Sequence, residues 1–116
     1  MDPSCIFCRI IAGEIPSQRL LDDEHLIAIR DIHPAAPVHV LVIPKEHIAS
    51  IDALEERHRE LAGRLLLAVG ELARREGVAE RGYRTVVNTG TEGGQTVGHL
   101  HVHLLGGRAL TGHGTG

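Results

Sequence analysis

The segment His99-Leu100-His101-Val102-His103-Leu104-Leu105 alternates imidazole and aliphatic side chains. Alternate side chains of a β-strand share a face, so the pattern predicts a strand with its three imidazoles on one face and Leu100, Val102 and Leu104 on the other. The aliphatic face belongs in a core. Three adjacent buried imidazoles would each need a hydrogen-bond partner, so we expect the histidine face to lie outside the core, beneath something polar.

Three interpretations of the histidine face follow from its chemistry. It is a solvated or carboxylate-paired surface, a metal site built on a His-x-His ligand pair, or a nucleophilic site in which His101 attacks phosphorus. Strict alternation directly after a glycine-rich loop disfavours the first. No carboxylate or further histidine follows closely enough to complete a hydrolytic metal centre. Imidazole is largely neutral and nucleophilic near pH 7, which suits the third interpretation.

The loop before this strand, residues 88–98, reads Asn-Thr-Gly-Thr-Glu-Gly-Gly-Gln-Thr-Val-Gly. It matches neither a Walker A loop nor a dinucleotide-binding fingerprint, and alone it is typical of an ordinary flexible hairpin loop. Its glycines nevertheless allow backbone N–H groups to approach an anion closely, and Gln95 and Thr96 add side-chain donors. Beside the histidines, the loop favours catalysis at a phosphate.

The rest of the chain contains patterns typical of both helices and strands, which predicts an α+β fold. Residues 5–12 indicate a short helix, and a second, long helix is expected to start at the capping-box pattern Asp52–Glu55 and to stop at Gly77. Strands are expected at 19–22, 25–30, 38–43, 83–88 and 99–105. Because short links cannot make parallel crossovers, the prediction is a largely antiparallel sheet of about five strands with one long and one short helix.

Length and composition restrict the function. A chain of 116 residues and 12.5 kDa fits one domain, 1–116, with an ordered core over about 5–110 and a flexible tail at 111–116. A net charge of −3 and two aromatic residues, Phe7 and Tyr83, argue against nucleic-acid binding. No stretch approaches the roughly 20 apolar residues of a membrane span, and no signal peptide is recognisable, so we expect a cytoplasmic protein with no membrane contact.

With these residues in place, the sequence resembles the histidine triad (HIT) family of nucleotide hydrolases and transferases. The resemblance extends over residues 5 to about 110. It is carried by the triad 99–105, Gly94–Val97 before it and Gly106–Arg108 after it, and further by segments 29–32, 37–48 and 83–88. Gly-Gly-Arg after the triad is similar to the Hint branch, whose members hydrolyse purine nucleoside phosphoramidates.

The resemblance implies a HIT-like fold and a role for each matching position. His101 would attack the α-phosphorus and form a nucleotidyl-histidine intermediate, and His103 would hydrogen-bond the phosphate. His39, which by its strand alone would be a satisfied core histidine, would support the triad. The remaining nucleotide contacts would be Phe7, Ile10, Asp31, Ile32, Asn88, Gln95 and Thr96, with Thr96 and Gln95 near the phosphate or leaving group.

The pair Cys5-x-x-Cys8 has three interpretations from spacing alone. A redox pair would normally follow a strand, and none precedes it; two packed thiols and half of a zinc site both stay open. The resemblance implies a structural zinc held by Cys5, Cys8, His47 and His99, with no organic cofactor. His58 lies among charged residues of the long helix, so we expect it to be solvated, and His113 falls in the tail.

The resemblance also implies a homodimer with a continuous sheet across its interface, acting on AMP or GMP derivatives. The same site could instead serve a dinucleoside polyphosphate hydrolase or a nucleotidyl transferase. An alternative of another class is a zinc-stabilised nucleotide-binding module with little activity. Gly98 stands where Hint relatives often carry an aromatic residue, and the tail lacks a tryptophan that some relatives place near the partner's active site.

Overall fold

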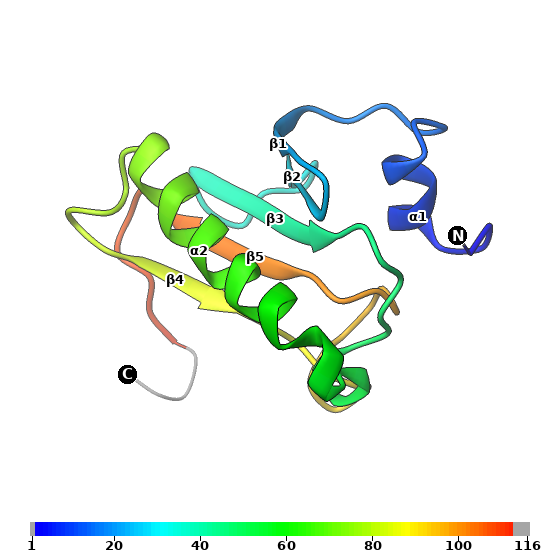
Figure 1. Ribbon diagram of the computed structural model, residues 1–116. Coiled ribbons are helices and arrows are strands. Elements are labelled where there is room, and N and C mark those ends of the chain that lie inside the picture. Colours follow the sequence, from blue (N-terminus) through cyan, green and yellow to red (C-terminus); the bar gives the residue numbers. More distant parts are fainter. Residues whose placement is uncertain (1, 113–116) are drawn as a thin grey trace.

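The computed structural model describes residues 2–112 as a five-stranded sheet with a helix on each face (Figure 1). The strands are β1 (Arg19–Asp22), β2 (Leu26–Arg30), β3 (Val38–Pro44), β4 (Tyr83–Val86) and β5 (Val102–Gly106), and every neighbouring pair is antiparallel. Their order across the sheet is β1-β2-β3-β5-β4. The predicted α+β class and antiparallel sheet are confirmed. Of the flexible tail expected at 111–116, residues 113–116 lie outside the described residues.

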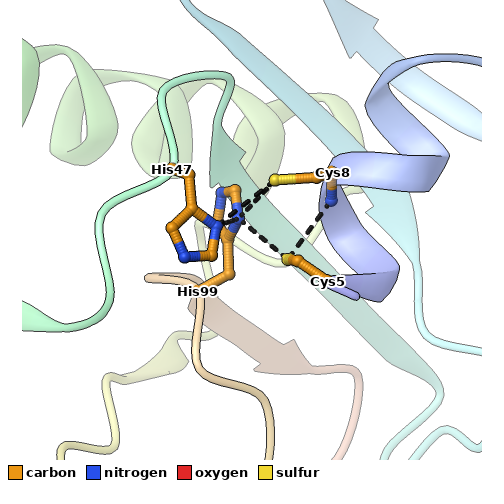
Figure 2. Close-up of side chains that lie close together, drawn as sticks. All are labelled: Cys5, Cys8, His47 and His99. Atoms are coloured by element: carbon orange, nitrogen blue, oxygen red, sulfur yellow. Dashed lines mark hydrogen bonds between the residues drawn. The ribbon is translucent and has the colours of Figure 1, made fainter. Parts of the chain in front are cut away.

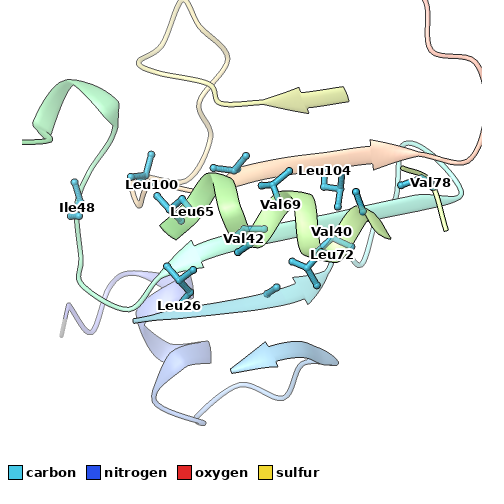
Figure 3. Packing of buried hydrophobic residues seen from close by; sticks show 14 residues of the cluster. Leu26, Val40, Val42, Ile48, Leu65, Val69, Leu72, Val78, Leu100 and Leu104 are labelled. Atoms are coloured by element: carbon cyan, nitrogen blue, oxygen red, sulfur yellow. The ribbon is translucent and has the colours of Figure 1, made fainter. Parts of the chain in front are cut away.

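The long helix α2 (Arg59–Arg75) covers one face of the sheet. Its buried residues recur at helical spacing, so they form one apolar stripe: Leu65, Ala68, Val69, Leu72 and Ala73. Figure 3 shows this stripe against Val40 and Val42 of β3 and Leu104 of β5. Since none of the described helices is both long enough and apolar enough for the purpose, none of them could cross a membrane.

The short helix α1 (Ile6–Ile11) packs on the opposite face of the sheet. Cys5 is its N-cap residue, and the Cys5 Sγ accepts a hydrogen bond from the main-chain N–H of Cys8. Phe7, Cys8 and Ile10 are buried. Their partners on the sheet are the aliphatic residues Ile27, Ile29, Leu41 and Ile43. Leu41 of β3 pairs with Ile29 of β2 on one side and with His103 of β5 on the other. The side chain of His103 therefore lies on this same face, beside Leu41.

The expected start of the long helix was wrong by several residues. Instead of one helix opening at Asp52, two 3-10 turns precede α2: η1 (Ile51–Ala53), capped by Ser50, and η2 (Glu56–His58). Between them Leu54 is extended, with φ −67° and ψ 140°, which breaks the helix. The capping box is formed by Glu55 and His58.

His58 is therefore not solvated, as its charged neighbours suggested, but 3 % exposed. Its Nδ1 accepts from the Glu55 N–H, so its Nε2–H donates to Glu46 Oε2 at 3.0 Å. The ring belongs to the capping box of η2, the turn before α2, rather than facing solvent.

The last strand begins at Val102 and not at His99. Antiparallel pairing of Val42 with Val102 would, if continued, bring Leu100 opposite Pro44. Proline has no N–H to donate, so the ladder stops there. Likewise β4 ends at Val86, two residues short of the expected Asn88. His99 lies in a bend, Leu100 and His101 have no regular secondary structure, and the Leu100 N–H donates instead to the Ile48 carbonyl at 2.7 Å.

Candidate functional site

The alternation of the histidine segment survives although its first half lacks sheet pairing. Leu100, Val102 and Leu104 belong to the core beneath α2, while the three imidazoles lie on the α1 side. The expectation that the imidazoles stay outside the core was wrong for two of them, because His99 is 0 % and His101 7 % exposed. Each of the two has a hydrogen-bond partner, which makes its burial tolerable.

The His101 ring is held in a single tautomer by its own segment. Its Nδ1 lies 2.7 Å from the carbonyl oxygen of His99, and a carbonyl only accepts, so Nδ1 carries the proton. In the neutral ring Nε2 then has a free lone pair. The Phe7 ring packs edge-on against His101 with centroids 5.0 Å apart, and the His103 ring lies at the same centroid distance. The geometry presents a fixed nucleophilic nitrogen.

A chain of hydrogen bonds fixes the other two tautomers of the site. The main-chain N–H of Ala35 donates to His39 Nδ1 at 3.0 Å, so a neutral His39 carries its proton on Nε2. That Nε2–H donates to His103 Nδ1 at 2.9 Å. A neutral His103 therefore bears its own proton on Nε2, where it can donate to an anion. The structure thus shows how His39 can support the triad: its Nε2–H is fixed as a donor to His103 Nδ1.

Burial keeps these two rings neutral. It lowers the pKa of His103 to about 4, and positive charge on His101 and His39 acts in the same direction. Burial also lowers the pKa of His39, against the opposing effect of the Asp31 carboxylate. Asp31 Oδ2 lies 3.4 Å from His39 Nε2, while Asp31 Oδ1 accepts from the His33 N–H. The site is therefore a neutral donor and acceptor array beside one carboxylate.

A cavity of about 660 Å³ opens beside His39 and His103. Asn88 lines it, with its Nδ2 donating to the Gly93 carbonyl at 2.7 Å. The other residues expected to bind nucleotide are spread around the histidines. Phe7 and Ile10 are buried in the cluster between α1 and the sheet, and Ile32 is 87 % exposed, two residues beyond the end of β2.

The two loop residues expected near phosphate have different surroundings. The Gln95 side chain is engaged within the chain, because its Nε2 donates to the carbonyls of Ala49 and Val97 and its Oε1 accepts from the Gly90 N–H. It holds the glycine-rich loop in place. Thr96 is exposed and lines a different cavity, which it shares with Cys5 and His47.

Sequence reasoning missed two arginines that line the His39–His103 cavity, Arg84 on β4 and Arg108 after β5. Alternation along the strand expected at 83–88 places residues 84, 86 and 88 on one face, and this was an available signal. Which face it would be depends on the pairing of Val86 with His103, a long-range register that the segment alone does not contain.

The four residues expected to hold zinc converge on one point (Figure 2). The His99 Nε2–H donates to the Pro44 carbonyl at 2.8 Å, so its Nδ1 lone pair faces the cysteines. Cys5 Sγ lies 3.3 Å from His99 Nδ1, Cys8 Sγ lies 3.3 Å from His47 Nδ1, and the two Nδ1 atoms are 3.1 Å apart. Tetrahedral zinc with ordinary bond lengths puts such ligand atoms about 3.3–3.8 Å apart, so the set fits the ion closely.

The donor chemistry agrees with this geometry. Burial raises the pKa of the Cys5 thiol, so buried thiolates here need a cation to stabilise them. Two cysteines and two histidines would fill four positions, which is the composition of a closed structural site. A bound zinc would tie α1 and the loop after β3 to the segment that carries the three histidines.

The fold and these two clusters have known counterparts. The profile of the HIT domain matches residues 12–110. The chain belongs to the HIT family. It is 44 % identical over 110 residues to the purine nucleoside phosphoramidase of Escherichia coli, covering 95 % of this chain and 92 % of that protein. A 14 kDa zinc-binding protein of Zea mays is 48 % identical over 111 residues, 94 % and 86 % of the two chains.

A solved HIT family hydrolase from Clostridium thermocellum superposes with a TM-score of 0.94 at 47 % identity, covering 97 % of this chain and 98 % of that one. The HIT-like fold expected from the sequence is confirmed.

Proposed function

We propose that this protein hydrolyses purine nucleoside 5′-phosphoramidates through a covalent nucleotidyl-histidine intermediate on His101. The observation that carries the proposal is the 2.7 Å bond from His101 Nδ1–H to the His99 carbonyl, which leaves Nε2 as a nucleophile in a water-poor setting. The phosphoramidase of E. coli, a HIT relative over nearly the whole chain, supports the substrate class.

The proposed reaction has two displacements at phosphorus. His101 Nε2 forms a bond to the α-phosphorus as the substrate's P–N bond breaks, and the leaving nitrogen takes the bonding pair and a proton from solvent to depart as a free amine. Water then attacks the phosphorus, the bond to His101 breaks, the nucleoside monophosphate leaves and the water's proton returns to solvent. The bond from His101 Nδ1–H to the His99 carbonyl stabilises the positive charge on the nucleotidylated ring.

His103 and His39 have a supporting role in this scheme. The tautomer chain from the Ala35 N–H aims His103 Nε2–H at the phosphoryl oxygens, where charge grows in the transition state. On the nucleoside side, Asp31 would accept from the ribose hydroxyls, with Phe7, Ile10 and Ile32 beside the base. Asn88, Gln95 and Thr96 would complete the phosphate and leaving-group environment.

The test is release of free amine from an adenosine 5′-phosphoramidate, comparing the parent with His101→Ala. His25→Ala, which removes a surface imidazole, is the matched control. We expect turnover to collapse in His101→Ala alone, and the parent quenched with denaturant at alkaline pH to show a nucleotidyl adduct by intact mass, because the P–N bond of a nucleotidyl-histidine is labile in acid. A parent that binds AMP but releases no amine would establish the binding module instead. Faster cleavage of a dinucleoside polyphosphate would favour the alternative hydrolase.

We further propose that Cys5, Cys8, His47 and His99 hold a structural zinc ion. Support comes from the convergence of two sulfur and two Nδ1 atoms and from the zinc-binding relative of maize. All four positions are protein ligands, so the ion would serve stability and not supply an open site for chemistry.

We also propose a two-fold dimer formed through α2 and the edge strand β4. Leu66 and Leu67 of α2 are 67 % and 75 % exposed, outside the apolar stripe that packs on the sheet. β4 is an edge of the sheet, with one side of its main chain free to pair. A second copy would cover the leucines and extend the sheet, as the family resemblance implies.

A further inference from the structure

The His39–His103 cavity lies on one side of the catalytic histidines only. The N–H of Asp31 donates to the His39 carbonyl at 3.0 Å, which extends the β2–β3 ladder by one row, and Leu105 pairs with both His39 and Arg84. Asp31, His39, Leu105 and Arg84 therefore form one row across the sheet. The expected ribose carboxylate is at one end, an arginine is at the other, and His39 and Leu105 lie between.

The cavity occupies the arginine end of this row. It is lined by His39, His103 and Asn88 and by Arg84, Arg108 and Leu110, whereas the residues assigned to the nucleoside, Phe7, Ile10, Asp31 and Ile32, are absent from its described lining. In an in-line displacement the leaving group departs on the side of the phosphorus opposite the attacking His101 nitrogen. The cavity is lined by His103 and Leu105, which follow His101 along the same face of the chain, and His101 is absent from its described lining, so the cavity lies away from the nucleophile and receives the leaving group.

The charge of the cavity is of one sign. Among the described residues that line it, Arg84 and Arg108 are cationic and none is acidic. Neither arginine forms an ion pair with a carboxylate in the part of the chain that the structure describes, unlike Arg19, Arg30 and Arg57. Their positive charge is therefore free to act on a ligand.

Both guanidinium groups are held in place by main-chain carbonyls. Arg84 Nη2 donates to the Leu110 carbonyl at 3.2 Å, and Arg108 donates from Nη2 to Ala35 at 2.8 Å and from Nη1 to Ala109 at 3.2 Å. A guanidinium has five N–H donors, so each keeps several for a further acceptor. Carbonyl partners orient an arginine without neutralising it, and this suits recognition of a carboxylate.

From this arrangement we infer an anion subsite for the leaving group, formed by Arg84 and Arg108, which selects amines that carry a carboxylate, such as amino acids. The inference rests on the proposed phosphoramidase function and names its leaving-group class. The bond that breaks is still the P–N bond; the carboxylate stays intact and is bound by the two arginines while the nitrogen departs.

The experiment compares two adenosine 5′-phosphoramidates that differ in one group, the N-linked β-alanine and β-alaninamide conjugates. We expect the parent to cleave the carboxylate substrate with a higher kcat/KM, by roughly tenfold, the scale of one charge-assisted hydrogen bond. In the double variant Arg84→Gln/Arg108→Gln this ratio should fall to about one. The ratio within each variant cancels differences in enzyme concentration and in folded fraction.

Two further variants give the comparison its controls. Arg75 also donates to a carbonyl, that of Leu20 on the opposite edge strand, so Arg75→Gln removes the same charge far from the cavity and should keep the parental ratio. Arg84→Lys/Arg108→Lys keeps the charge and should restore part of the preference. An equal ratio in the parent and the Gln double variant would overturn the subsite while leaving the phosphoramidase intact. Absence of cleavage of both substrates by the parent would overturn the phosphoramidase proposal, and the subsite with it.

Discussion

His39 Nε2 lies 2.9 Å from His103 Nδ1, and the Ala35 N–H on the far side of the His39 ring decides which of the two nitrogens donates. One backbone amide thus sets the protonation pattern of two imidazoles. Removing His39 leaves His103 Nδ1 without its donor in a half-buried position, so His103 is no longer held with its proton on Nε2.

His39→Ala should therefore lower both stability and catalysis. An unsatisfied buried polar group costs about 1–3 kcal/mol, and a lost orienting partner costs roughly 10- to 100-fold in kcat. Urea denaturation and amine release measure the two effects. His25→Ala, at the surface, is the control, and an unchanged kcat in His39→Ala would contradict the tautomer chain.

The lowered pKa of His103 makes stability depend on acidity in a defined direction. The unfolded imidazole titrates near 6.5 and the folded one near 4, so between these values the unfolded state binds more protons. The free energy of unfolding should fall as pH drops from about 6.5 toward 4 and should lose this dependence below that range. Denaturation midpoints at half-unit pH steps measure it. His103→Asn should flatten the slope, and an equal slope in both proteins would sink the assignment.

The zinc site predicts a linked loss of metal and stability. Cys8→Ser should bind less zinc and melt at a lower temperature, because binding energy at a closed four-ligand site contributes to folding. Metal analysis after dialysis and thermal melting with and without a chelator measure both quantities. His33→Ala changes an exposed histidine that precedes β3, whereas His47 follows it, and should leave zinc content and melting temperature unchanged. A parent with no zinc whose melting is indifferent to chelator would contradict the site.

The proposed dimer predicts that a charge on the exposed face of α2 produces monomers. Leu67→Glu would place an unpaired carboxylate in an apolar interface, which dissociates a modest interface. Light scattering coupled to gel filtration reports the mass, about 12.5 kDa for a monomer. Ile51→Glu, an exposed aliphatic residue of η1, is the matched control. A parent that is already monomeric at high concentration would exclude the dimer.

Local periodicity was enough to predict most of the fold. The alternation at 99–105 assigned Leu100, Val102 and Leu104 to the core, and the apolar stripe of α2 was visible at helical spacing. What failed was local hydrogen bonding decided by distant partners. Pro44 ended the β3–β5 ladder, and Glu46 gave the buried His58 ring a hydrogen-bond acceptor, neither of which short-range patterns could reveal.

The candidate site likewise has residues that the sequence predicted and residues that it did not. Cys5, Cys8, His47 and His99 were grouped by resemblance, and the structure brings them together. Arg84 was overlooked because its place in the same row of the sheet as His39 depends on Leu105 pairing with both strands, a relation among three segments far apart in sequence. Residue types and their spacing indicate chemistry within one segment, whereas the lining of a cavity depends on how strands far apart in sequence pair with one another.

Gly107, the middle residue of the Gly-Gly-Arg motif, packs against Pro37 and can be compared with Gly13, a second glycine of similar backbone conformation. Gly13 and Gly107 both have left-handed backbones, with φ of +82° and +93°, so an added Cβ costs each about 1–2 kcal/mol. At Gly13 no neighbouring atom lies within 4 Å of that Cβ, whereas at Gly107 it would lie 2.9 Å from the Cβ of Pro37. Pro37 closes the loop that carries Ala35. Gly107→Ala should therefore be the more destabilising substitution and should also lower kcat, since displacement of the loop moves the N–H that orients His39. Equal stability losses and parental kcat in both alanine variants would show that the loop tolerates the shift and that the contact with Pro37 does not position His39.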